Sequence, residues 1–334
     1  MKEFSGSSVI GIKKFYEKTN RFEARKFEDD ISLTFIENGS VKPSIAFNHQ
    51  RCPLCSSSLD NSILQFIKSG YKHWICKDCN GIYTNPSINN DTIETKVYGE
   101  TPYPFLDSVN SETQLNFDIK RFKHALNKIV AYGCDTKGHV FDFGCGSGLF
   151  LNLCKLYGFT GFKGNDLLKK AVEISNNEYN LSETLLVNAQ NDTHRIDDET
   201  KLIAMWEFLD HINEPQIFLQ RITEQIKAGT FIIFSVRNSM SLAARVLREK
   251  SNMFLGHAHF NFWAKETIEL ILNKFNFELM EHYQYISERE PVKNYLNYNS
   301  IYDSVSNELN WLPSDDVILA NDLGYKHVVI ARKL

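Results

Sequence analysis

Hydrophobic residues recur in two alternating patterns along the last two thirds of the chain, from about residue 117. Short apolar runs predict buried strands, and stretches with apolar residues three or four apart predict amphipathic helices. Because runs and helices alternate, the sequence predicts a doubly wound α/β fold with a mostly parallel sheet. The predicted strands are 140–143, 162–166, 185–187, 202–206, 231–235, 277–285 and 326–332, and the predicted helices are 117–132, 149–157, 167–177, 216–227 and 265–274.

Residues 1–50 carry a weaker pattern. Apolar and polar residues alternate over 31–36, which predicts a strand. Glu37-Asn38-Gly39-Ser40 is typical of a hairpin turn, and Pro43 would restrict the following stretch, 41–47, to a sheet edge. We therefore expect a β-rich or irregular N-terminal segment, and its residues suggest no chemistry.

A glycine-rich turn follows the first strand of the α/β region. Asp142 lies near the end of that strand, and Gly144, Gly146 and Gly148 come directly after it. Glycines allow backbone dihedrals that a Cβ forbids and let a ligand approach the bare backbone. A dinucleotide site would have its third glycine one residue later, where Leu149 stands, so an NAD-dependent enzyme is disfavoured. Asp166 ends the next strand, where it could accept both ribose hydroxyl protons.

These residues resemble the S-adenosylmethionine (SAM) site of class I methyltransferases over about 117–276. The resemblance implies that the glycine turn holds the methionine end of SAM, together with Asp142, which acts through the loop amides. It also implies that Asp166 holds the ribose of SAM. It also implies a reversed last strand and adenine-side residues after the third strand, where Asp192 could supply an acid. The implied cofactor-binding residues are Asp142, Gly144, Cys145, Gly146, Gly148, Asp166, Leu167, Ala189, Gln190 and Trp206.

Two Cys-x-x-Cys pairs predict a zinc ribbon over residues 51–86. Cys52 and Cys55 form the first pair, and Cys76 and Cys79 follow after 20 intervening residues. Four thiolates leave zinc no open position, so the metal would be structural. Disulfides are the alternative, although no secretory signal is evident. We expect Gly81 to provide a left-handed turn after the second pair. His73 could replace a ligand, but a surface position is expected for it; Cys134, Cys145 and Cys154 lack ligand spacing.

The order of the cysteine pairs, Asn85-Pro86 and a tyrosine-bearing linker resembles bacterial methyltransferases with an N-terminal zinc-binding domain. Those proteins often modify sugars, surface glycans or secondary metabolites. The resemblance implies a linker or lid over 87–116, in which Tyr98 and Tyr103 close over the ligands or simply pack between domains. It also implies a methyltransferase domain over 117–334, with an insertion at 289–322 near the acceptor pocket.

Transfer to an alcohol requires a base. The first candidate for this base is His211, which follows the fourth strand, and Asp210 could orient it or replace it. His257 and His259 are the second candidates. For each histidine, a packing role is the alternative. The resemblance to sugar C-methyltransferases is partial, because their Tyr-His-Glu-His motif appears here as Gly256-His257-Ala258-His259. We therefore expect transfer to oxygen, with nitrogen open and carbon less favoured.

Composition and charge argue against some classes of function. The net charge is −4 and the pI is about 6.2, which argues against an RNA methyltransferase that grips RNA through its zinc ribbon. No apolar run is long enough to cross a membrane, so we expect a cytoplasmic protein. A non-catalytic SAM-binding subunit remains the other alternative, and only turnover would distinguish it. The expected partner is a small-molecule or glycan acceptor.

Overall fold

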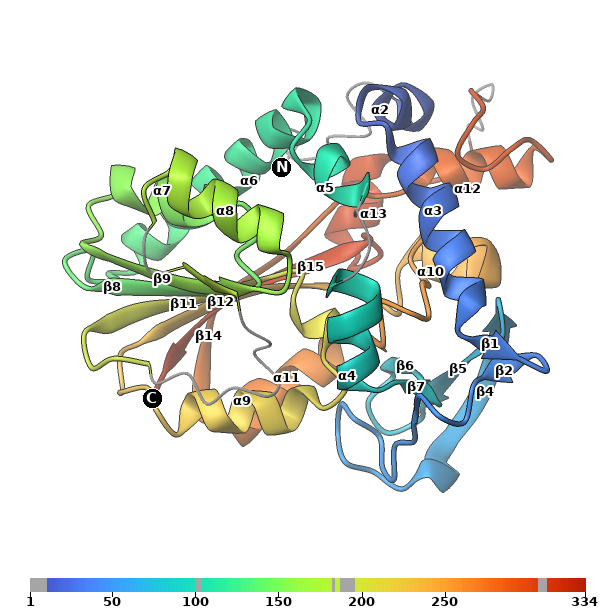
Figure 1. Cartoon of the computed structure of the whole chain (residues 1–334), viewed down its shortest axis with the longest axis horizontal. Helices are drawn as coiled ribbons and strands as arrows, with labels where there is room; N and C mark the ends of the chain where they lie inside the picture. Colours follow the sequence, from blue (N-terminus) through green and yellow to red (C-terminus); the bar gives the residue numbers. More distant parts are fainter. Residues whose placement is uncertain (1–10, 100–103, 182–183, 187–195, 306–310) are drawn as a thin grey trace.

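The computed structural model describes residues 11–99, 104–181, 184–186, 196–305 and 311–334. Within them, a seven-stranded sheet forms the centre of the molecule, in the order β10–β9–β8–β11–β12–β15–β14 (Figure 1). β15 is antiparallel to both neighbours, and the other pairs are parallel. Its strands are β8 (His139–Phe143), β9 (Gly161–Asp166), β10 (Thr184–Leu186), β11 (Thr200–Trp206), β12 (Phe231–Arg237), β14 (Phe277–Tyr285) and β15 (Lys326–Lys333).

Helices cover both faces of this sheet, which confirms the predicted class. One face carries α6 (Glu112–Ala131), α7 (Leu149–Leu156) and α8 (Lys169–Glu178), and the other carries α9 (Pro215–Thr223) and α11 (Lys265–Lys274) (Figure 1). Alternate residues of β11 divide between the two cores: Leu202 and Ala204 pack with α6 and α7, whereas Ile203 and Met205 pack with α9 and α11. This division follows from the two-residue period of a strand.

The N-terminal segment differs from its prediction. Residues expected to be β-rich or irregular form two helices, α2 (Ile12–Lys18) and α3 (Arg21–Thr34). The strand expected over 31–36 is therefore wrong, because Ile31 packs from α3 together with Phe35. The hairpin turn is confirmed by the antiparallel pair β1 (Ile36–Glu37) and β2 (Ser40–Val41), while 41–47 is broken into β2 and β3 (Ala46–Phe47), which pairs with β7 (Ser87–Ile88).

The cysteine-bearing segment shares a sheet with the C-terminal half of the chain. β4 (Ser62–Lys68), β5 (Tyr71–Cys76) and β6 (Ile82–Thr84) form an antiparallel sheet that β13 (Asn261–Phe262) completes. η2 (Leu59–Asn61) precedes β4. Thr267 of α11 donates a hydrogen bond of 2.8 Å to the carbonyl of Cys79. The second cysteine pair is thus fixed to the helix layer of the large sheet.

The remaining elements surround the carboxyl ends of the parallel strands. Between β7 and α6 lie α4 (Asn90–Thr92), the π-helix η3 (Ile93–Gly99) and α5 (Pro104–Val109). Beyond β11 come η4 (Leu209–His211), α10 (Leu242–Leu247), η5 (Arg248–Lys250), α12 (Arg289–Leu296) and α13 (Asp315–Ala320). α2 lies beside α12, since the amide of Ile12 donates to Glu290, and α3 follows α2 (Figure 1). No helix in the described ranges is long and apolar enough to span a bilayer.

Candidate active site

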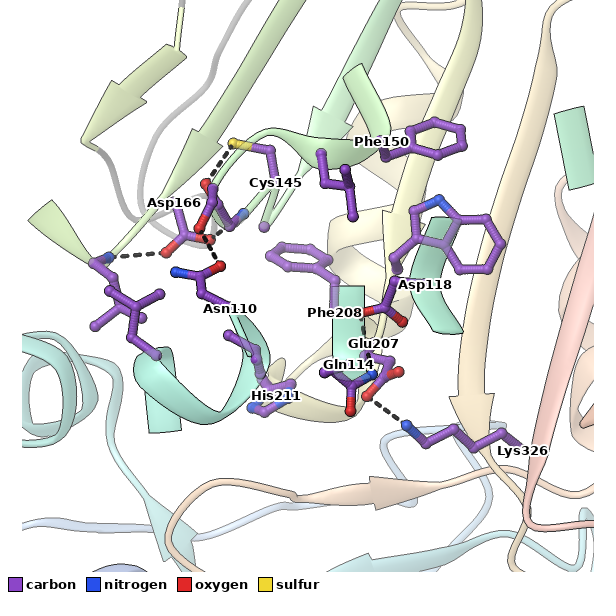
Figure 2. Close-up of a pocket in the computed structure, with 18 of the residues that line it drawn as sticks. Asn110, Gln114, Asp118, Cys145, Phe150, Asp166, Glu207, Phe208, His211 and Lys326 are labelled. Atoms are coloured by element: carbon purple, nitrogen blue, oxygen red, sulfur yellow. Dashed lines mark hydrogen bonds and ion pairs between the residues drawn. The ribbon is translucent and has the colours of Figure 1, made fainter. Parts of the chain in front are cut away.

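A cavity of about 360 Å³ lies at the carboxyl ends of β8, β9, β11 and β12. Its wall combines the glycine turn with residues from α2, α3, η3 and α6 and with the start of β15. Figure 2 shows Asp166 and Cys145 on one side of it and Glu207 and Lys326 on another, with Phe208 between them. In open α/β sheets, ligands bind at this edge.

Asp142 is buried beneath the glycine turn, at 2% exposure. Its Oδ1 accepts no hydrogen bond from any described residue. Burial raises the pKa of Asp142 well above its ordinary value, and the nearby Asp166 adds to the rise. A buried carboxylate oxygen without a donor is costly, so this atom is suited to a ligand that donates a hydrogen bond.

The three glycines adopt left-handed backbone, with φ of 68°, 54° and 82° at Gly144, Gly146 and Gly148. A Cβ on Gly144 would lie 2.7 Å from the ring of Phe208, and one on Gly148 would lie 2.4 Å from the hydroxyl of Ser175. Gly146 has no such neighbour within 4 Å. The first and third glycines are therefore needed for close packing, and the middle one faces open space where a ligand can approach.

Asp166 lies against the same turn. Its two carboxylate oxygens accept hydrogen bonds from the amides of Gly146, at 2.8 Å, and Leu168, at 2.9 Å. The neighbouring Asn165 accepts one from Gly144. Asp166, Leu167 and Cys145 all line the cavity. The fold thus brings together the two acids and three glycines that the sequence singled out.

The aromatic wall differs from the expected one. Trp206 lines the cavity but is mostly enclosed by Phe122 and Phe150, with ring centroids 4.7 and 5.5 Å away. Phe208 covers Gly144 and was not predicted. Ala189, Gln190 and Asp192, expected beside the adenine, lie outside the described residues, as does Tyr103.

A network of buried charges, also absent from the sequence prediction, joins the ends of β11 and β15. Glu207 contacts Lys326 at 2.5 Å and Arg121 at 3.0 Å, and Arg121 contacts Asp118 at 2.6 Å. Burial raises the pKa of Glu207, but Lys326 and Arg121 outweigh it and hold that pKa well below its ordinary range. Glu207 therefore stays ionised as part of the cavity wall.

Two of the predicted histidines reach the cavity. Nδ1 of His211 lies 3.3 Å from the hydroxyl of Tyr98, and the rings of His211 and His259 meet edge to face at 4.8 Å. His259 donates from Nδ1 to the carbonyl of Met253, which leaves Nε2 as the acceptor. Burial and the nearby Arg237 lower the pKa of His211 to about 3. The same two causes lower the pKa of His259 well below its ordinary value, so both imidazoles are neutral.

The other two candidate catalytic residues, Asp210 and His257, do not line the cavity. The carboxylate of Asp210 contacts Arg237, and no hydrogen bond in the described part of the chain joins it to the His211 ring. His257 is fully buried away from the cavity wall. Its neighbour Gly256 packs on Tyr71, since a Cβ there would lie 2.0 Å from that ring. Neither Asp210 nor His257 thus lies on the cavity wall, and their catalytic roles stay predictions.

The four paired cysteines form a separate cluster, in which their sulfur atoms all lie within 4.8 Å of one another. Cys52 and Cys79 are 3.9 Å apart, and Cys55 and Cys76 are 3.6 Å apart. A tetrahedral zinc site, with Zn–S near 2.3 Å, requires sulfur separations of about 3.8 Å. A disulfide requires about 2.05 Å, so the alternative of disulfides does not fit.

Both cysteine pairs have the same backbone turn. The amide of Ser56 donates to Cys52 and that of Asn80 to Cys76, each at 2.9 Å, and Ser56 and Asn80 are both left-handed. The left-handed residue is therefore Asn80, and not Gly81 as expected. Gly81 is required for another reason, because a Cβ there would lie 2.4 Å from Leu54.

His73 also differs from its prediction as a surface residue. It is fully buried between Phe66 and Phe254, with ring centroids 5.0 and 5.2 Å away. The cluster that the structure brings together consists of the four cysteines alone among the described residues.

The parallel sheet with its reversed last strand, the glycine turn and the two adjacent acids define a class I SAM-dependent methyltransferase. A family model described as a methyltransferase domain matches residues 115–282. The chain belongs to this methyltransferase family.

Solved methyltransferases match the chain at low sequence identity and with TM-scores below 0.5. The magnesium protoporphyrin IX methyltransferase of Synechocystis PCC 6803, solved with bound S-adenosylhomocysteine (SAH), is 13% identical, covers 73% of this chain and 97% of its own, and gives a TM-score of 0.43. A SAM-dependent methyltransferase from Archaeoglobus fulgidus is 19% identical, with 64% and 94% covered and a TM-score of 0.42. Curated proteins give no match to the chain.

Proposed function

We propose that this methyltransferase transfers the methyl group of SAM to a hydroxyl of a small molecule, namely a sugar, a glycan or a secondary metabolite. The observation that carries the proposal is one continuous cavity, which extends from the glycine turn to a second, polar end. That end is built by Tyr98, His211 and His259, together with residues of α2 and α3.

The residues of the first end fit SAM. Oδ1 of Asp142 is a buried acceptor without a donor among the described residues. Gly146 leaves space for a ligand to approach the backbone of the turn, and Asp166 lines the cavity wall at the end of β9. In this proposal Asp142 and the turn hold the methionine part, and Asp166 accepts from the ribose hydroxyls. Bound SAM supplies the activated methyl group through its sulfonium leaving group.

The residues of the second end would position the acceptor. Holding a hydroxyl oxygen in line with the methyl group can contribute about 7–11 kcal/mol to lowering the barrier. His259 is neutral, and its Nε2 can accept a hydrogen bond from a hydroxyl. His211 is also neutral, and its Nδ1 lies against the hydroxyl of Tyr98. Tyr98 contacts His211 from the 87–116 segment, which supports a covering role for that segment over the cavity.

We further propose that the four cysteines bind one structural zinc ion and that residues 51–86 form a zinc ribbon. The sulfur separations and the matched turns support this assignment. Because four thiolates would complete its coordination, the ion would stabilise the fold without taking part in methyl transfer. The cluster also packs in the same core as Trp263 and Ile268, so its loss should disturb the helix layer beneath the large sheet.

The test is SAH release with nucleotide sugars, free glycans and phenolic metabolites as acceptors. Wild type, His211→Ala and His259→Ala would be compared, with SAH binding by calorimetry as the control for folding. Turnover of at least one hydroxyl acceptor that drops tenfold or more in His211→Ala, while SAH still binds, supports the proposal. Methylation of RNA or of carbon alone, or SAH binding without turnover of any acceptor, would refute it.

A further inference from the structure

Four carboxylates line the cavity beyond the glycine turn: Glu28, Asp118, Glu207 and Glu288. Three of them are held by cations at short range. Glu28 contacts Arg25 at 2.9 Å, Asp118 contacts Arg121 at 2.6 Å, and Glu207 contacts Lys326 at 2.5 Å.

Glu288 differs from these three. Its hydrogen bond comes from the hydroxyl of Tyr302, at 3.5 Å, and no ion pair within 4.0 Å joins it to the described residues. It is 9% exposed and faces the cavity. A buried carboxylate held so loosely keeps its lone pairs available to a ligand.

The backbone around Glu288 is strained. Ile286 and Glu288 both adopt left-handed backbone, with φ of 62° and 51°, and the cavity residue Glu207 does the same at 52°. Left-handed backbone is costly for residues other than glycine, and most of all for a β-branched residue such as isoleucine. Such strain tends to persist where it places functional groups. Here it directs the chain between β14 and α12 toward the cavity.

Resting on the proposed function, we infer that Glu288 accepts the proton of the acceptor hydroxyl during methyl transfer. As the oxygen lone pair forms the new O–CH3 bond, the S–CH3 bond breaks and its electron pair stays on sulfur. The hydroxyl proton passes to the Glu288 carboxylate, and solvent later removes it. The products are the methyl ether, SAH and a proton, so charge and atoms balance.

The surroundings of Glu288 suit this role. Burial raises its pKa to about 7, although nearby Arg25 and Lys326 oppose the rise. A base with a pKa near the working pH combines availability with proton affinity. His211, whose pKa lies near 3, would hold a proton poorly. The charged and titratable groups that face Glu288 are Tyr16 of α2, Arg21 and Arg25 of α3, Tyr302, and Tyr325 and Lys326 at β15.

The experiment compares wild type with Glu288→Gln, which keeps the shape of the side chain but removes the base. Glu290→Gln is the matched control, because Glu290 accepts the amide of Ile12 and is absent from the cavity wall. For an alcohol acceptor, kcat of Glu288→Gln should fall about 100-fold or more with little change in SAH affinity. The loss should be smaller for a phenolic acceptor, whose hydroxyl is more acidic, and Glu290→Gln should retain kcat.

The pH profile gives a second, independent readout. Wild-type kcat should fall as pH drops through about 7, because protonated Glu288 cannot accept the hydroxyl proton. This limb should be lost in Glu288→Gln. A kcat of Glu288→Gln within threefold of wild type, or a wild-type profile flat between pH 5.5 and 8, would overturn the inference while the proposed function stands. If wild type methylates no hydroxyl acceptor, the proposed function itself fails.

Should Glu288→Gln not bind SAH, the wild-type pH profile and the alcohol-to-phenol comparison decide alone. An acid limb near pH 7 for the alcohol that weakens for the phenol supports Glu288, and its absence contradicts it.

Discussion

Nη1 of Arg237 donates a hydrogen bond of 2.5 Å to Oδ2 of Asp210, with both side chains buried. The amide of Arg237 also donates to the same carboxylate. This pair joins the loop after β11 to the end of β12, where Arg237 lines the cavity. Since His211 follows Asp210, the pair fixes the backbone from which the His211 ring reaches the cavity.

Breaking this pair should destabilise the protein strongly. Asp210→Asn removes the charge that compensates the buried guanidinium, which typically costs about 3–5 kcal/mol. Urea unfolding of Asp210→Asn, Arg237→Gln and the double variant would measure this loss. The double variant should lose clearly less than the sum of the two single variants, because neither charge is left alone. Additive losses would show that the two side chains are not coupled.

The glycine turn allows a test of close packing separately from backbone strain. Gly144→Ala should weaken SAH binding at least tenfold, because the new Cβ would lie 2.7 Å from Phe208 in addition to the strain of a left-handed alanine. Gly133→Ala is the control: Gly133 is also left-handed, at φ 85°, but a Cβ there meets nothing within 4 Å. Calorimetry with SAH should therefore find near-normal affinity in Gly133→Ala. Equal weakening in both variants would assign the effect to global strain.

The sequence predicted those elements whose structure depends on residues close together in the chain. The glycine turn needs left-handed dihedrals and close packing at particular positions, so Gly144 and Gly148 are visible in the sequence itself. α11 and β14 have the predicted boundaries. In α11 the apolar spacing agrees with the burial of Ile268, Ile271 and Leu272.

Other features depend on contacts between distant residues. The partner of Asp210 is Arg237, 27 residues away, so the adjacent His211 suggested the wrong relationship. In α3, Ile31 and Phe35 are four residues apart and share one cluster, but the local alternation hid this helical spacing. Glu288 had no sequence signal, because its role depends on which neighbours carry charge in the folded chain.

Zinc binding can be tested by metal content. We expect one zinc per chain in wild type and none in Cys79→Ser, together with a lower melting temperature, because metal-binding energy contributes directly to folding. Cys134→Ser is the control, since Cys134 is also buried but lies outside the four-cysteine cluster, with its thiol hydrogen-bonded to the carbonyl of Lys201. This control should retain its zinc. Wild-type protein without zinc after expression in zinc-supplemented medium would contradict the assignment.

The raised pKa of Glu288 has a consequence for stability that requires no acceptor. Between pH 4.5, its ordinary pKa, and about 7, the folded protein keeps a proton on Glu288 that the unfolded chain has lost. Stability from this group therefore falls as pH rises through that window and stays low above it. The difference between the two pKa values corresponds to roughly 3 kcal/mol. Glu288→Gln abolishes the titration, so the variant should gain stability relative to wild type by up to about that amount at pH 8. At pH 4 the gain should be close to zero. Urea unfolding of both proteins at the two pH values measures the change, and an equal difference at both would show that Glu288 titrates alike in the folded and unfolded chains.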